Sequence, residues 1–160
     1  MKTTITRRIE WDAAHRILRH ESKCRSVHGH RYVALLTVTA PKLDAQDRVI
    51  DFSVLKERVG SWVDDRWDHT TLVNQADTEL LLFTSAQALN GNKKPFAFDG
   101  EPTAESIAAV LYGVAVALLA DTGIIVDSVE VFETPNCSAK VDRVNLGDVH
   151  ARFDTGGGEV

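Results

Sequence analysis

Cys24-Arg25-Ser26-Val27-His28-Gly29-His30 runs directly into an apolar, strand-like segment, Tyr32 to Ala40. Two histidines at positions i and i+2 point to the same face of an extended chain. Side chains on one face of a strand can share a metal ion, and Cys24 would lie on the approach to it. This stretch therefore organises our interpretation of the rest of the chain.

A second strand-like segment, residues 3–15, precedes this stretch. Its apolar residues share odd parity and end at His15, whereas the even positions are polar. The polar segment 16–25 turns the chain back. If the two strands pair antiparallel, His15 approaches His28 and His30, provided that the register brings them together. These three histidines are our candidate metal ligands.

Further elements follow along the chain. Helical patterns lie at about residues 51–66, 78–90 and 103–123, and strand-like segments at 48–50, 96–98, 125–134 and 138–144. Thr103 is a candidate N-cap of the last helix, and Gly123 a candidate stop. Strands cluster at the two ends with helices between them. This order predicts an α+β fold, an antiparallel sheet with two main helices on one face.

Length, charge and cysteine content narrow the functional classes. The chain has 160 residues, 44% of them hydrophobic, and a net charge of -5, which suits one folded domain. A sequence-independent nucleic-acid binder needs a basic surface, so no nucleic-acid partner is expected. The apolar run Ala108 to Ala120 is too short for a bilayer, so no membrane is expected either. Without a signal peptide, we expect a cytoplasmic protein with Cys24 and Cys137 as free thiols.

The histidines allow more than one interpretation. Three nitrogen ligands would leave one position of a zinc ion open for a substrate oxygen. Alternatively, they are ordinary polar histidines near a turn. Cys24 is also ambiguous, because it would be inert as a fourth ligand in a closed structural site. Near a cation, however, a thiol has a lowered pKa and can act as a base or nucleophile.

Three acidic positions carry weaker signals. Asp68 could orient the imidazole of His69 for proton transfer, although adjacent residues do not face each other on a helix. Glu133 continues the apolar face of its strand, so it needs either a protein partner or a ligand with N–H donors. Glu105 lies in the first turn of a helix, where an acid also stabilises the helix dipole.

Together these residues resemble the pterin synthase family that contains 6-pyruvoyltetrahydropterin synthase and bacterial 6-carboxytetrahydropterin synthase. The resemblance covers about residues 5–140. The motifs that carry it, in order, are Trp11-Asp12-Ala13-Ala14-His15-Arg16, Cys24-x-x-x-His28-Gly29-His30, Val49-Ile50-Asp51-Phe52 with Leu55-Lys56, Trp67-Asp68-His69-x-x-Leu72, Pro102-Thr103-Ala104-Glu105 and Glu133-Thr134.

The resemblance implies a role for each group. The three histidines match the zinc ligands of the family, with one Zn2+ per subunit, and Cys24 matches its catalytic base. The proton-relay pair corresponds to Asp68 and His69. Glu133 matches the acid that anchors the pterin, whose adjacent N–H donors suit a bidentate carboxylate. The segment that helps to hold the pterin ring comprises Thr103, Ala104 and Glu105.

The branch of the family is implied by one spacing. The three-residue gap between Cys24 and His28 resembles the 6-carboxy type. That type converts 7,8-dihydroneopterin triphosphate and water to 6-carboxytetrahydropterin, acetaldehyde and triphosphate, on the path to queuosine. A pyruvoyl-type triphosphate lyase is the nearest alternative, and a non-catalytic, zinc-stabilised binding module a remote one.

The resemblance also implies a T-fold (tunnelling fold) domain over residues 1–144, assembled into an oligomeric barrel. A hexamer, a dimer of trimers, is expected, with sites between subunits. Residues 145–160 are predicted to be a mobile C-terminal tail. The segment from about 74 to 100 is longer than the usual link in the family. Candidate triphosphate contacts, by charge and proximity alone, are Arg16, Arg19, Lys23 and Arg25.

Overall fold

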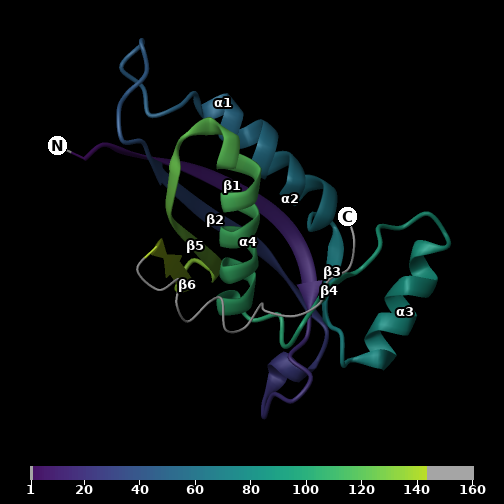
Figure 1. Cartoon of the computed structure of the whole chain (residues 1–160). Helices are drawn as coiled ribbons and strands as arrows, with labels where there is room; N and C mark the ends of the chain where they lie inside the picture. Colours follow the sequence, from purple (N-terminus) through teal and green to yellow (C-terminus); the bar gives the residue numbers. More distant parts are fainter. Residues whose placement is uncertain (1, 144–160) are drawn as a thin grey trace.

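The computed structural model describes residues 2–143, so the predicted tail, residues 145–160, lies outside the described part of the chain. Its centre is a six-stranded sheet with the order β4-β3-β1-β2-β5-β6 (Figure 1). The strands are β1 (Thr4–His15), β2 (His28–Thr39), β3 (Thr70–Asn74), β4 (Phe96–Phe98), β5 (Ile125–Thr134) and β6 (Cys137–Asp142).

The hairpin of β1 and β2 forms in the register on which the metal prediction depends. The two strands pair antiparallel, from Thr4 opposite Thr39 to His15 opposite His28. Odd positions of β1 and even positions of β2 face the core, where Trp11 and Tyr32 are fully buried and stack at 5.2 Å between ring centroids. Apolar alternation thus selects the register, because a one-residue slip would expose every core side chain.

The sheet is mixed rather than wholly antiparallel. Strands β1, β2, β5 and β6 pair antiparallel, as predicted. Strands β3 and β4 extend the sheet beyond β1 in parallel. The expected strand at residues 48–50 is absent and those residues form bends. The predicted α+β class is confirmed, and the correction concerns one edge of the sheet.

Two helical segments cover one face of this sheet, as predicted (Figure 1). The first is continuous over residues 52–66: α1 (Phe52–Leu55), a π-helical turn η2 (Lys56–Gly60) and α2 (Ser61–Arg66). The second is α4 (Ala104–Leu119), capped by Thr103, whose hydroxyl accepts the Ser106 N–H. After a short 3-10 turn, η3 (Ala120–Thr122), Gly123 adopts a left-handed φ of 74° and ends the helical segment.

Helix α4 is long and apolar enough, together with η3, to raise the question of a membrane span. The helical segment Ala104–Thr122 has 19 residues and would suffice by length and composition, contrary to our reading of its apolar run as too short. Its inward residues, including Ile107, Leu111 and Leu119, are buried in the same core as β5. The core helix of a soluble protein has this composition too, so the segment is weak evidence for a membrane protein.

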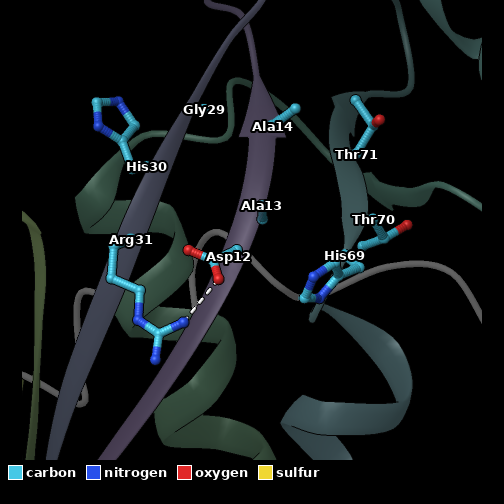
Figure 2. Close-up of a pocket in the computed structure, with 9 residues that line it drawn as sticks. All are labelled: Asp12, Ala13, Ala14, Gly29, His30, Arg31, His69, Thr70 and Thr71. Atoms are coloured by element: carbon cyan, nitrogen blue, oxygen red, sulfur yellow. Dashed lines mark hydrogen bonds and ion pairs between the residues drawn. The ribbon is translucent and has the colours of Figure 1, made fainter.

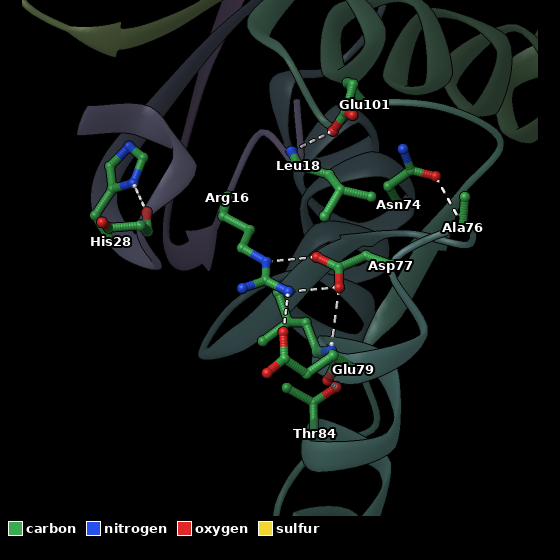
Figure 3. Close-up of polar contacts among 11 residues, drawn as sticks. Arg16, Leu18, His28, Asn74, Ala76, Asp77, Glu79, Thr84 and Glu101 are labelled. Atoms are coloured by element: carbon green, nitrogen blue, oxygen red, sulfur yellow. Dashed lines mark hydrogen bonds and ion pairs between the residues drawn. The ribbon is translucent and has the colours of Figure 1, made fainter. Parts of the chain in front are cut away.

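The long segment between the Asp68-His69 pair and α4 contains a third helix, α3 (Thr78–Ala88). This helix lies apart from the two helical segments that cover the sheet (Figure 1). Its N-cap Asp77 is only 2% exposed and receives two hydrogen bonds from the Arg16 guanidinium, at 2.5 and 2.6 Å (Figure 3). Since Arg16 directly follows His15, this ion pair holds α3 to the strand that carries a candidate ligand.

Candidate active site

Three imidazoles converge at the end of the β1–β2 hairpin. The rings of His15 and His28 lie 4.6 Å apart between centroids, those of His28 and His30 4.9 Å, and those of His15 and His30 5.1 Å. One nitrogen from each lies within 4.8 Å of the other two. This spacing results from the hairpin register and from strand alternation. The cluster could therefore hold one metal ion.

Backbone carbonyls orient two of these rings. The Nδ1 of His15 lies 2.8 Å from the Pro102 carbonyl oxygen, and that of His28 lies 2.8 Å from the Ser26 carbonyl oxygen. A carbonyl only accepts, so in both rings Nδ1–H donates and Nε2 keeps its lone pair. The buried Nε2 of His15 has no partner within residues 2–143. Second-shell hydrogen bonds of this kind are typical of metal-binding histidines, so these residues fit a zinc ion.

Burial keeps His15 in the form that binds metals. Desolvation lowers the pKa of His15 to about 4, despite the Pro102 carbonyl, and also lowers that of His30. Both rings are therefore neutral near pH 7, and no proton has to leave before their nitrogens can bind a cation.

Cys24 lies close in sequence but outside the three-histidine cluster. It belongs to a short 3-10 turn, η1 (Lys23–Arg25), and is partly exposed. Its carbonyl oxygen accepts the Ile17 N–H at 2.9 Å, which closes the loop between the two strands. The group of mutually close ligand atoms contains three histidines and not this thiol. This arrangement gives no support to Cys24 as a fourth ligand.

Glu133 and Glu105 lie on the same side of the sheet as the cluster. Burial raises the pKa of Glu133, the Glu105 carboxylate raises it further, and His28 opposes the shift. Glu133 therefore lies near both Glu105, in the first turn of α4, and His28. The Pro102 carbonyl on His15 joins the same segment to the cluster. The predicted pterin-holding residues Thr103, Ala104 and Glu105 therefore adjoin the cluster, at the first turn of α4.

Asp68 and His69 form a pair, but not on a helix. They lie in the turn between α2 and β3, where the Asp68 Oδ2 is 2.7 Å from the His69 Nδ1. The other Asp68 oxygen accepts the Asp12 N–H at 3.0 Å, and the His69 N–H donates to the Asp12 carbonyl at 2.7 Å. His69 is held at a left-handed φ of 55°. The objection that neighbouring residues cannot face each other therefore does not apply.

His69 of this pair lines a shallow pocket formed by β1, β2 and β3. The pocket has a volume of about 570 Å³ and is lined by Asp12, Ala13, Ala14, Gly29, His30, Arg31, His69, Thr70 and Thr71 (Figure 2). Alternation along the strands directs the Asp12 and Arg31 side chains away from the face that carries the histidine rings. Although burial opposes the shift, the Asp12 N–H and the His69 ring lower the pKa of Asp68. His30 of the cluster lines this pocket together with His69, but among the described residues the group of mutually close ligand atoms contains neither Asp68 nor His69.

Several contacts of the site were not visible in the sequence. The carbonyls of Pro102 and Ser26 are backbone groups, which no residue pattern identifies. Arg16, a candidate for the triphosphate by charge, is instead engaged by Asp77 and Glu79. The full burial of the Tyr32 hydroxyl beside the histidines was also not expected from an apolar-strand pattern.

The fold and the site together define a small α+β protein with a three-histidine cluster suited to a metal and a half-buried carboxylate beside it. The chain belongs to the 6-pyruvoyl tetrahydropterin synthase family, which matches residues 4–144. The 6-carboxy-5,6,7,8-tetrahydropterin synthase of Rickettsia bellii is 37% identical over 139 residues, 85% of this chain and 97% of that protein. The enzyme of the same name from Haemophilus influenzae is 30% identical over 135 residues, 82% of this chain and 92% of that protein.

Solved structures show the same fold at lower identity. An uncharacterized protein from Wolinella succinogenes superposes with a TM-score of 0.78 at 22% identity, over 89% of this chain and 99% of that one. The 6-pyruvoyl tetrahydropterin synthase of Caenorhabditis elegans superposes with a TM-score of 0.64 at 21% identity, over 89% and 96%. The predicted T-fold is therefore confirmed.

Proposed function

We propose that this chain is a zinc-dependent 6-carboxy-5,6,7,8-tetrahydropterin synthase, a lyase. It would convert 7,8-dihydroneopterin triphosphate and water to 6-carboxytetrahydropterin, acetaldehyde and triphosphate in queuosine biosynthesis in the cytoplasm. The single observation that carries the proposal is the three-histidine cluster beside Glu133, in a chain 37% identical to enzymes with this activity in their names. The three-residue gap from Cys24 to His28 supports the same branch.

Each residue of the site has a place in this chemistry. His15, His28 and His30 would hold one Zn2+ through nitrogen atoms, and the bound ion would polarise a side-chain oxygen of the substrate. Glu133 would accept the paired N–H donors of the pterin, beside Thr103, Ala104 and Glu105. Burial raises the pKa of Glu133, and a pair of N–H donors would stabilise the ionised carboxylate there. Cys24 would remove a proton from carbon.

The relay pair would come from another subunit. The His69 side chain is 74% exposed, and Asp68 fixes the Nδ1 proton of His69 so that its Nε2 is free to exchange a proton. A homo-oligomer, such as a hexamer built as a dimer of trimers, would place this Nε2 at a neighbour's Cys24. The open pocket around His69 supports such an arrangement, because it leaves His69 accessible from outside its own chain.

The first experiment measures turnover directly. Zinc-loaded protein incubated with dihydroneopterin triphosphate should release acetaldehyde and a pterin with the mass of the 6-carboxy product. A 6-pyruvoyl product would establish the pyruvoyl-type alternative instead. Absence of both products from zinc-loaded, folded protein would refute the assignment as a synthase.

Variants of the two cysteines separate an enzyme from a zinc-stabilised binding module. Cys24→Ala should retain zinc and the fold but lose turnover, whereas Cys137→Ala, at the exposed second cysteine, should resemble the wild type. Loss of zinc and unfolding in Cys24→Ala would favour the binding module, because Cys24 would then be a structural ligand.

Mixed oligomers test the shared site. Cys24→Ala and His69→Ala should each be inactive alone. After joint unfolding and refolding, about one quarter of the sites would combine an intact Cys24 with an intact His69 from a neighbour, if assembly is random. Recovery of activity near that level supports sites between subunits, and no recovery in mixed oligomers of confirmed composition contradicts them.

A further inference from the structure

The Tyr32 side chain is fully buried, yet its hydroxyl has no hydrogen-bond partner in the described part of the chain, residues 2–143. Buried hydroxyls normally find a partner, because leaving one unpaired forfeits its bond to water. Tyr112 shows the ordinary case: it is 2% exposed and its hydroxyl donates to the Val126 carbonyl at 3.2 Å. The question is therefore which group pairs with the Tyr32 hydroxyl when the protein functions.

Packing explains the ring of Tyr32 but not its oxygen. The ring stacks on Trp11 at 5.2 Å and an interplanar angle of 11°, and it meets the His15 and His30 rings edge-on at 5.9 and 5.4 Å. Phenylalanine would make all of these contacts without burying a polar atom. The hydroxyl thus adds a cost to folding that the contacts among residues 2–143 do not offset.

The position of Tyr32 connects the two halves of the proposed site. Along β2, inward-facing positions run His28, His30, Tyr32, and its ring centroid lies 5.4 Å from that of His30 and 5.9 Å from that of His15. Val33 pairs with Phe132 at the end of the β2–β5 ladder, so Tyr32 and Glu133 each adjoin this last pair in sequence. Tyr32 therefore lies beside the histidine rings, at the end of the ladder next to which Glu133 follows on β5.

A ligand that joins these two groups must pass Tyr32. In a pterin, the N–H donors that suit Glu133 occupy one end of the ring edge, and the side chain that would reach a metal leaves carbon 6. Between them the same edge carries only acceptors, the ring carbonyl oxygen and the neighbouring ring nitrogen. A neutral hydroxyl beside the histidines, at the end of the ladder that adjoins Glu133, offers the donor that these acceptors need.

We propose that the Tyr32 hydroxyl is a positioning group that donates a hydrogen bond to the acceptor edge of the bound pterin, between Glu133 and the histidine cluster. The inference rests on the proposed function for the class of ligand. The hydroxyl sets the distance of carbon 6 from the histidines by holding the ring at its middle, while Glu133 holds it at its end. An unpaired donor in the free protein becomes paired in the complex.

The test compares Tyr32→Phe with Tyr112→Phe, which removes the same atom from a satisfied tyrosine. The probe is neopterin, a fluorescent pterin without the triphosphate, titrated into zinc-loaded protein. Tyr32→Phe should bind neopterin about tenfold more weakly, the factor for one lost hydrogen bond. Its KM for dihydroneopterin triphosphate should rise by a similar factor, with its zinc content and its urea midpoint equal to or above those of the wild type. Tyr112→Phe should show the opposite pattern, unchanged neopterin binding and a lower urea midpoint.

Two outcomes overturn the proposal. One is wild-type neopterin affinity in Tyr32→Phe. The other is a Tyr32→Phe protein that unfolds or is destabilised as much as Tyr112→Phe, which would show that the hydroxyl is satisfied internally, for example by a bound water. Failure of the synthase assignment is distinguishable, because it appears in the wild type as missing acetaldehyde, whereas this test reads pterin binding.

Discussion

The Arg16–Asp77 ion pair should be a main source of stability for the α3 segment. Asp77 accepts two hydrogen bonds from the Arg16 guanidinium and one from the Leu80 N–H as the N-cap of α3. The Asp77 side chain is 2% exposed and that of Arg16 18%. Substitution of Asp77 by Asn removes the charge but keeps a good N-cap, so it isolates the ion pair.

The magnitude follows from burial. Breaking a fully buried pair costs about 3–5 kcal/mol, and the partial exposure of Arg16 reduces this, so Asp77→Asn should lower the free energy of unfolding by about 2–3 kcal/mol. Asp77→Ala should cost about 1 kcal/mol more, because the N-cap is lost too. Glu79→Gln is the matched control: Glu79 also contacts Arg16, at 3.0 Å, but its side chain is 85% exposed, and it should cost less than about 1 kcal/mol.

The contribution of this ion pair should also depend on pH. The Arg16 hydrogen bond holds the pKa of Asp77 below its ordinary value of 3.8 in the folded protein, with burial opposing the shift. A carboxylate of this kind stabilises the fold fully above its unfolded pKa, and the stabilisation is lost as the pH falls through the depressed folded value. The difference between wild type and Asp77→Asn should therefore be constant from about pH 5 to 7 and shrink below about pH 4.

Urea unfolding at equal protein concentration measures these differences, since an oligomer's stability depends on concentration. A cost below about 0.5 kcal/mol for Asp77→Asn at pH 7, within the range of ordinary surface substitutions, would refute the reasoning. So would a cost for Glu79→Gln equal to that for Asp77→Asn, because the burial of the carboxylate would then have no effect.

Three further predictions concern helix ends and the metal. Thr103→Ala should lower stability by about 1 kcal/mol through loss of the N-cap of α4, whereas Thr103→Ser should remain near the wild type in urea unfolding. Gly123→Ala should cost about 1 kcal/mol, because Gly123 has a φ of 74° and an alanine is strained there; an unchanged urea midpoint would contradict this. His28→Ala should reduce bound zinc, measured by elemental analysis, to well below one per chain and abolish the loss of thermal stability that a chelator causes in the wild type. His20→Ala, outside the cluster, should retain full zinc, and equal zinc in both variants would argue against the three-histidine ligand set.

The sequence contained enough information for the hairpin and its histidines. Alternation over β1 and β2 requires one register to bury Trp11, Tyr32 and their neighbours, and that register places His15 opposite His28. Local signals also sufficed for α4, because the Thr103 cap and Gly123 act within one turn of the helix. In both cases the determining interactions are either close in sequence or repeated along a strand.

The parallel edge of the sheet could not be predicted in this way. Strands β3 and β4 have five and three residues, too few for a clear period. In a parallel pair, the partner is separated by a long crossover, so neighbouring residues do not reveal it. The chain order of strands and helices predicted the class of fold, but not which strand adds to β1.

Residue patterns predicted the three histidines, Cys24, the Asp68–His69 pair and Glu133 as candidate functional groups, because metal and proton chemistry need particular side chains. Only the tertiary structure decided how they are arranged. The carbonyl that orients His15 comes from Pro102, 87 positions away, and the Asp12 backbone on β1 fixes both Asp68 and His69. The burial of the Tyr32 hydroxyl without a partner in residues 2–143 was likewise decided only by the tertiary structure. These features depend on contacts between distant segments, which form only when the sheet and α4 pack together.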